Sequence, residues 1–258
     1  MATVTFDKAS IDARAVETPA AASTAIVPVV EQSIVVDERP SNLSGANEFD
    51  SKDLNLPYLS LVQKISPLID EIPNLRAGSY VFNKELILTP DPKTPVSVVI
   101  AKFSKVYEED IEFGAEERPR LFKTIKEARD EGFDEEYGSE KRVIRRADFT
   151  FLIQAPAGLS DSQLDAFPFD IDGNAYALGN FTARKGAYNT TAKVVISLLQ
   201  LGTFLERNGV KALHHGMFDL SSTLKTNEKN TWYQPVIKAG KKTPDSVVEF
   251  IENVLTTS

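Results

Sequence analysis

Strand-forming runs separated by short turns dominate this sequence. The clearest run is residues 96–107, VSVVIAKFSKVY, which is rich in β-branched and aromatic side chains. Further runs occupy residues 80–88, 141–153, 175–181, 217–224 and 232–237. Most links between them are too short for the crossover that a parallel pair needs. The sequence therefore predicts an α+β fold around a largely antiparallel sheet, either OB-like or of a distinct topology.

Three segments have helical periodicity instead. Residues 119–133 repeat apolar side chains at the spacing of one face of a short helix. A longer helix is expected over residues 187–207, with Gly209 as its C-terminal stop. The last helix is expected to begin with Thr243 as N-cap and Pro244 in the first turn.

Acidic residues are concentrated in two segments. Residues 1–53 have a net charge of −5 and only two aromatic side chains, so we expect a disordered or loosely attached acidic tail. Residues 54–258 are expected to form a single domain, in which residues 108–140 are an acidic insertion of net charge −8. Residues 141–242, in contrast, hold 14 Lys and Arg against eight Asp and Glu. Because salt screens charges beyond about 10 Å, the overall charge of −8 does not exclude a polyanionic partner.

The composition excludes several classes of protein. The chain has no cysteine, which rules out disulfides, thiolate metal sites and a cysteine nucleophile. No apolar run approaches the roughly 18 residues of a membrane span, and the first residues lack a secretory signal pattern. We therefore expect a soluble, cytoplasmic protein without membrane contact. Neither a P-loop nor a nucleophile elbow is present, so no enzymatic activity and no cofactor are expected.

Two groups of residues are possible metal ligands. The only two histidines, His214 and His215, are neighbours in the chain. On a strand they would point to opposite faces and would not easily share one ion. Glu108, Asp110 and Glu112 are the candidates for a nuclease that uses Mg²⁺, but such an acidic run is more typical of a solvated loop. We therefore expect no metal site.

Cationic and aromatic side chains alternate in several segments of the positively charged part. Binding of single strands needs both, because cations neutralise phosphates and aromatic faces stack on bases for about 1–3 kcal/mol each. The strand at residues 96–107 would place Lys102 and Ser104 on one face, and Lys105 and Tyr107 on the other. Each aromatic residue in these segments is also a candidate for the hydrophobic core. The candidate nucleic-acid contacts are Lys102, Lys105, Tyr107, Lys141, Arg142, Arg145, Arg146, Phe181, Arg184, Lys185, Tyr188, Lys193, Lys225, Lys229 and Trp232.

Several motifs resemble an opening common in a family of early proteins of tailed phages. They are LPYLSLVQKISP at residues 56–67, AGSY at residues 77–80, and the strand that ends in a basic and aromatic stretch at residue 107. Residues 181–188 and 218–235 are similar to the second half of that family, and the likeness covers about residues 54–240. The resemblance implies binding of single-stranded DNA. It also implies recruitment of a small phage RNA polymerase, or of replication proteins.

We therefore expect a non-enzymatic, sequence-tolerant single-stranded-DNA-binding protein of phage origin that supports transcription or replication. The acidic segments are expected to contact protein partners, and assembly into homo-oligomers is left open. The first alternative is a virion or assembly protein, in which the strands and residues 1–53 make subunit contacts. The second is the nuclease with acidic metal ligands. The residues themselves leave the preference between DNA and RNA open.

Overall fold

A long antiparallel pair, β4 (Val96–Glu109) and β6 (Val143–Gln154), lies at the centre of the computed structural model, which describes residues 56–112, 117–202, 204, 206, 209 and 212–256. The pair belongs to a seven-stranded sheet of order β10-β9-β4-β6-β8-β7, and β5 pairs with β4. The other strands of this sheet are β5 (Leu121–Phe122), β7 (Phe169–Ile171), β8 (Asn174–Arg184), β9 (Gly216–Thr226) and β10 (Thr231–Lys242). Every described pair is antiparallel, which confirms the predicted α+β class. The described strand order does not close from β10 to β7, so the topology is an open sheet.

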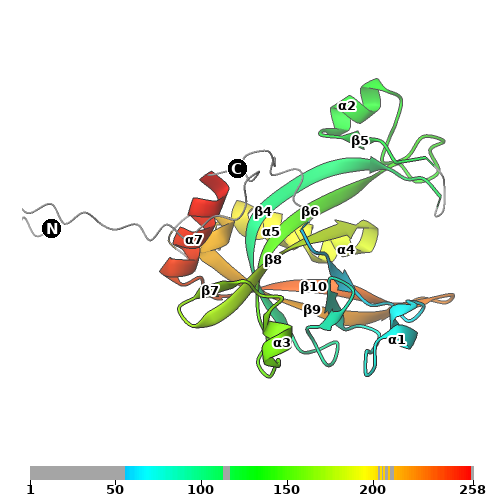
Figure 1. The fold of residues 1–258 in the computed structure, drawn as a ribbon. Helices are drawn as coiled ribbons and strands as arrows, with labels where there is room; N and C mark the ends of the chain where they lie inside the picture. The colour runs from blue at the N-terminus through cyan, green and yellow to red at the C-terminus, as the bar shows by residue number, and fades with distance from the viewer. Residues whose placement is uncertain are drawn as a thin grey trace, which may run out of the picture. The chain divides into compact units, whose positions relative to one another are not determined.

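A second, three-stranded sheet and several short helices complete the fold (Figure 1). The small sheet consists of β1 (Leu59–Leu61), β2 (Tyr80–Phe82) and β3 (Leu86–Ile87). The helices are α1 (Leu68–Glu71), α2 (Ile125–Asp130), α3 (Asp161–Leu164), α4 (Lys185–Thr190), α5 (Ala192–Gln200), the 3₁₀ turn η2 (Leu213–His215) and α7 (Asp245–Thr256). In the described part of the chain, no helix has the length and apolar character required to cross a bilayer. The expected tail at residues 1–53 lies outside the described residues.

Two local predictions were wrong in instructive ways, and the condition attached to a third, that the histidines lie on a strand, is not met. The expected helix at residues 119–133 is shorter, because the Thr124 side chain accepts a hydrogen bond from the Glu127 N–H at 3.1 Å and so begins α2 late. The residues before it pair with β4 instead. The expected helix at residues 187–207 begins earlier, and Thr191 separates α4 from α5 because its backbone angles (φ −122°, ψ −79°) are not helical. His214 lies on η2 rather than on a strand.

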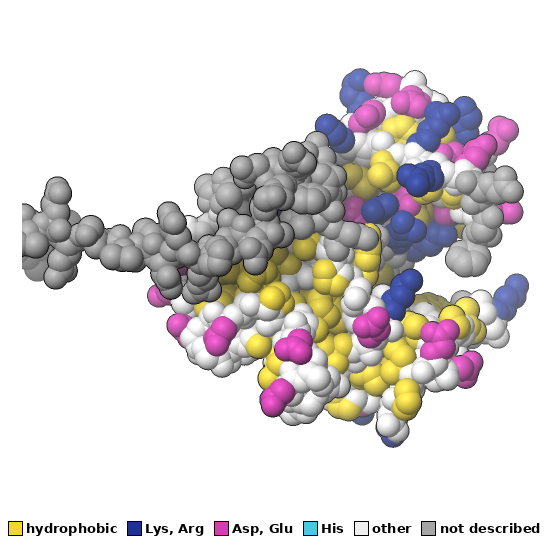
Figure 2. All heavy atoms as spheres, viewed as in Figure 1, with side chains coloured by type: hydrophobic (Ala, Val, Ile, Leu, Met, Phe, Trp, Pro, Cys, Tyr) yellow, Lys and Arg dark blue, Asp and Glu magenta, His cyan; other side chains and the backbone are white. Residues whose placement is uncertain are grey.

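Beyond the main sheet, the ends of β4 and β6 continue together and carry β5 and α2; we call this extension the arm (Figure 1). A small hydrophobic cluster holds the arm together, formed by Tyr107, Phe122, Ala128, Phe133 and Val143. In the space-filling view, Lys and Arg side chains mix with Asp and Glu on the arm (Figure 2). The acidic insertion is therefore partly structured, with its own small core.

One extra residue in β4 decides which side chains face the core. The pairing of β4 with β6 shifts register between Ile100 and Lys102, which makes Ala101 a β-bulge. In a regular strand Lys102 would share a face with the buried Ile100. The bulge instead turns Lys102 to the opposite face. Phe103 then points toward the core, where its ring lies 5.0 Å from the ring of Phe149.

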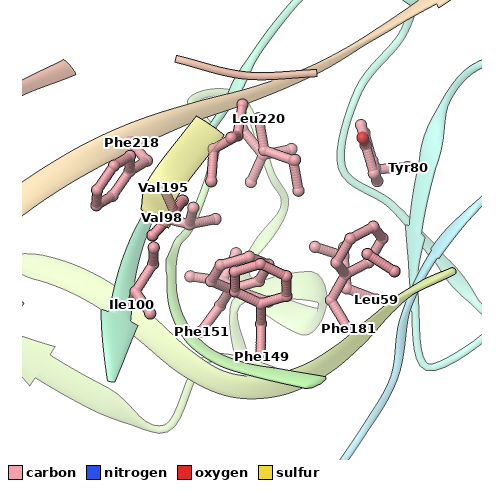
Figure 3. Packing of buried hydrophobic residues seen from close by; sticks show 14 of the residues in the cluster. Leu59, Tyr80, Val98, Ile100, Phe149, Phe151, Phe181, Val195, Phe218 and Leu220 are labelled. Carbon is pink, nitrogen blue, oxygen red and sulfur yellow. The ribbon is translucent and has the colours of Figure 1, made fainter. Parts of the chain in front are cut away.

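The main core lies on one face of the large sheet and is rich in phenylalanine (Figure 3). The rings of Phe149 and Phe151 stack at 5.1 Å, and the ring of Phe181 lies 5.9 Å from that of Phe151. Val195 of α5 packs against this cluster. On the opposite face, α7 covers a second cluster through its Val247 and Ile251 side chains. The two faces of the sheet are thus covered by different helices.

The small sheet and the segments beside it are fixed to the β9–β10 hairpin by hydrogen bonds. The Gln63 side chain donates to the Tyr233 carbonyl and accepts from the Tyr233 N–H, both at 2.9 Å. The Ser222 hydroxyl donates to the Gly78 carbonyl at 2.6 Å, and the Tyr80 hydroxyl donates to the Ser221 carbonyl at 2.9 Å. These bonds connect residues far apart in the sequence and hold β1 beside β10.

We predict that Gly78→Ala destabilises the protein more than Gly138→Ala does. Both glycines have a positive φ, 92° and 91°, so a left-handed backbone costs each alanine about 1–2 kcal/mol. A Cβ at Gly78 would also lie 2.5 Å from the Tyr233 ring, whereas a Cβ at Gly138 meets nothing within 4 Å. Urea unfolding should show a further loss of about 1–3 kcal/mol for Gly78→Ala. Equal losses for both variants would show that the contact with Tyr233 is not tight.

Candidate nucleic-acid interface

A band of polar side chains crosses one face of the sheet on the side opposite the phenylalanine core. Directly paired residues of antiparallel strands share a face, so the register defines this band row by row. The first row is Lys102, Thr150 and Asn180; the second is Ser104, Asp148 and Thr182; the third is Val106, Arg146 and Arg184. Hydrogen bonds link neighbours within it, for example from the Thr182 hydroxyl to Asp148 at 2.7 Å. We call these three rows the polar face.

The polar face forms the floor of an open groove that continues between β1 and β10. The first part of the groove is lined by the polar face and Tyr58, and the second part by Arg184, Lys185 and Trp232 among others. The two parts share Tyr58, Phe181 and Thr182, so they lie next to each other. Figure 2 shows a hollow between the arm and the β9–β10 hairpin, with Lys and Arg side chains along its wall.

Two aromatic rings in the groove are exposed. Tyr58 is 53% exposed and Trp232, the single tryptophan of the chain, is 38% exposed. Trp232 pairs across the hairpin with Lys225, so a cation and a ring lie side by side there. Exposed rings next to cations are the arrangement that binds unpaired bases through stacking and phosphates through charge.

Three other aromatic residues predicted as contacts are buried. Tyr107, Phe181 and Tyr188 are 6%, 5% and 3% exposed, and they pack in hydrophobic clusters. Burial raises the pKa of the Tyr188 hydroxyl above the ordinary tyrosine value, which agrees with its place in the core. A buried ring has no free face for a base. The prediction that these rings stack on bases is therefore wrong, and the core accounts for them.

Carboxylates at the end of β4 hold the cations of the groove in place. The Glu108 side chain, only 2% exposed, lies 2.8 Å from Arg184 Nε and 3.5 Å from Arg146. Among the described residues, no contact of Glu108 Oε2 has the geometry of a hydrogen bond. The ion pair with Arg184 therefore holds this oxygen. Asp110 makes a similar bridge, at 3.0 Å to Arg142 and 2.9 Å to Lys185. Two acidic residues thus connect β4, β6 and the start of α4.

The same network reduces the positive charge of the groove. Arg146 also contacts Asp148 at 2.9 Å. Arg145 contacts Glu135 at 2.6 Å, and the hydrogen bond to this carboxylate raises the pKa of the arginine. The cations that the sequence grouped together are therefore interleaved with carboxylates. Their effect on a polyanion is smaller than the charge of residues 141–242 indicates.

The remaining candidates are distributed over the surface. Lys102 has no carboxylate partner in the part of the chain that the structure describes. Lys105 lies on the face opposite the groove floor and donates to the Tyr107 hydroxyl at 3.0 Å. Lys141 lies over the Phe133 ring of the arm, at 5.6 Å from its centroid. Lys193 is on α5, and Lys225 and Lys229 are at the tip of the β9–β10 hairpin.

The structure thus brings six predicted residues together in the groove, namely Lys102, Arg146, Phe181, Arg184, Lys185 and Trp232, although the Phe181 ring is buried. It does not bring Lys105, Lys141, Lys193 or Lys229 to them. Sequence reasoning missed Tyr58, which stands in an apolar run without a cation beside it. It also missed the role of Glu108, because an acidic run near a loop gives no sign that one of its members is buried.

No metal site is formed by the acidic residues proposed for a nuclease. Glu108 and Asp110 are each bridged by two cations. Among the described residues, one group has ligand atoms close enough for an ion, and it consists of His214, His215 and Glu252.

Comparison with known proteins identifies no relative of this chain. No family model, no curated protein and no solved structure matches it. The resemblance to early proteins of tailed phages therefore stays a prediction from sequence motifs.

We predict that Glu108→Gln lowers the free energy of unfolding by about 1–3 kcal/mol, because it leaves Arg146 and Arg184 beside a neutral amide. Glu112→Gln removes the same charge from an exposed side chain and serves as the control. It should change stability by less than about 0.5 kcal/mol. Urea unfolding measures both values. Equal stability of the two variants would show that the buried carboxylate is not a structural anchor.

Proposed function

We propose that this chain binds single-stranded nucleic acid, single-stranded DNA in particular, along the groove and without strong sequence preference. The observation that carries the proposal is the pair of exposed rings, Tyr58 and Trp232, in a groove that also contains Lys102, Arg184 and Lys185. Stacking accepts any base because every base has a π-face, which explains tolerance of sequence.

The exposed rings of the groove favour an unpaired strand over a duplex. In a duplex the bases are stacked on each other, so a protein ring reaches a base face only after unstacking, which costs a few kcal/mol. Two cations of the groove, Arg184 and Lys185, already have carboxylate partners, and the phosphates must compete with these. Binding is therefore expected to be moderate in affinity and strongly dependent on salt.

The proposal assigns contacts with a phage RNA polymerase or with replication proteins to the arm. The acidic insertion there has a net charge of −8, and two of its apolar side chains are exposed, Tyr137 at 89% and Leu121 at 53%. An exposed aromatic ring surrounded by charge is typical of protein contact surfaces. Separate surfaces would then hold the nucleic acid and the partner.

Gel-shift titrations with single-stranded DNA, single-stranded RNA and duplex DNA of equal length test the proposal. We expect the tightest binding to a single strand. The titration with RNA shows whether the affinity depends on the sugar. Equal binding to all three, or no binding at low salt, would remove the proposal. A high copy number of the protein in purified phage particles would then favour the virion alternative.

We predict that Trp232→Ala weakens binding of single-stranded DNA by about 5- to 150-fold, the loss of one stacked base. The matched control is Leu224→Ala, which removes an exposed apolar side chain, 48% exposed, from the same hairpin. Because Trp232 is the only tryptophan, quenching of its fluorescence reports directly on groove occupancy in the unchanged protein. Tight binding without any quenching would place the nucleic acid elsewhere.

We further predict that Arg184→Ala combined with Lys185→Ala lowers the slope of log K against log salt by about one to two. Both side chains are more than half exposed at the groove wall, at 51% and 63%. The control is Lys238→Ala combined with Lys241→Ala, two exposed cations farther along β10. A slope that both double variants lower equally would indicate general electrostatic attraction rather than contacts at the groove.

A further inference from the structure

Both histidines of the chain lie at one junction, far along the sequence from the acidic end of β4. His214 and His215 form the 3₁₀ turn η2, and Glu252 is on α7. The Thr243 N–H donates to the His215 carbonyl at 3.0 Å, which brings the start of α7 next to η2. The 3₁₀ turn directs both imidazoles toward the same helix, whereas a strand would have separated them.

The side chains at this junction have the spacing of a metal site. His214 Nε2 lies 3.3 Å from a carboxylate oxygen of Glu252, and His215 Nε2 lies 3.8 Å from the same oxygen. All three ligand atoms are within 4.8 Å of one another. Tetrahedral Zn²⁺ with bonds of about 2.0–2.1 Å separates its ligand atoms by about 3.3 Å. Small side-chain rotations therefore suffice to complete the site.

A pairwise hydrogen bond does not account for the whole group. The contact of His214 with Glu252 is within hydrogen-bond distance, but the 3.8 Å contact of His215 is not. The two imidazole rings lie with their centroids only 4.6 Å apart, and both Nε2 atoms lie close to the same carboxylate oxygen. One bound cation would contact both imidazole nitrogens and this oxygen at once.

We propose that His214, His215 and Glu252 bind one Zn²⁺ ion, with a fourth position open to water. Two imidazole nitrogens and one carboxylate oxygen are a ligand set that zinc accepts. The ion would join η2 to α7, whose Val247 and Ile251 cover one face of the sheet. It would therefore stabilise the attachment of the last helix. The proposal does not depend on the binding of nucleic acid.

The composition makes this proposal easy to test. The chain has no cysteine and no histidine outside this pair, so no second site with thiolate or imidazole ligands exists. Untagged full-length protein should bind one Zn²⁺ in isothermal titration calorimetry. The melting temperature should rise with Zn²⁺ concentration and fall again when a chelator is added. Co²⁺ in place of Zn²⁺ should give the visible absorption of a four- or five-coordinate ion.

Three variants distinguish the site from non-specific binding to carboxylates. His215→Ala and Glu252→Gln should each weaken Zn²⁺ binding at least tenfold. Glu249→Gln, which removes an exposed carboxylate from the same helix, should leave it unchanged. Melting curves without metal show whether each variant is folded. Absence of saturable binding, or equal binding by all variants, would overturn the proposal, and single-stranded-DNA binding measured on the same samples tests the groove separately.

Discussion

The alternation of side chains along β4 and β6, interrupted once at Ala101, determines both faces of the sheet. Up to Ile100, one face of β4 is apolar and packs in the phenylalanine core. The bulge then keeps Phe103 in that core and turns Lys102 to the other side, although Lys102 stands only two positions after Ile100. If β4 paired with β6 regularly, without the bulge, Lys102 would enter the core, and burying its charge would cost far more than the bulge. The polar face, and with it the floor of the groove, follows from this single insertion.

Much of the fold follows from local patterns in the sequence, but the site follows only in part. The β-branched runs identified β4, β6, β9 and β10 because a half-buried strand needs that composition over several consecutive residues. The order of strands, the bulge and the docking of β1 beside β10 depend on contacts such as Gln63 with Tyr233, 170 residues apart, and no local pattern shows them. For the same reason the sequence located Trp232 and Arg184 in candidate segments but gave no sign that Tyr58 lies beside them.

The carboxylates at the end of β4 impose a compromise on the groove. Glu108 and Asp110 fix the guanidinium and ammonium groups of three segments in one place, which reduces the entropy that a ligand must remove when it binds. They also neutralise part of the positive charge of the groove. In the proposed complex, a phosphate would gain from Arg184 only what remains after competition with a buried carboxylate, so the rings would supply a large share of the affinity. Such a balance would favour ready release of the strand.

The groove and the last helix share one face of the sheet, and three neighbouring positions mark the border between them. Leu152 is buried beneath α7, whereas Thr150, the next residue on that face of β6, belongs to the polar face. The same change from an apolar to a polar side chain occurs between Leu178 and Asn180 on β8, and between Ala101 and Lys102 on β4. The apolar half of this face needs the cover of α7. Without it, an exposed apolar surface would lie next to the groove and favour aggregation. An ion bound by His214, His215 and Glu252 would stabilise this border, because it would hold α7 in place. This helix covers the apolar half of the face and leaves the polar half open for a ligand.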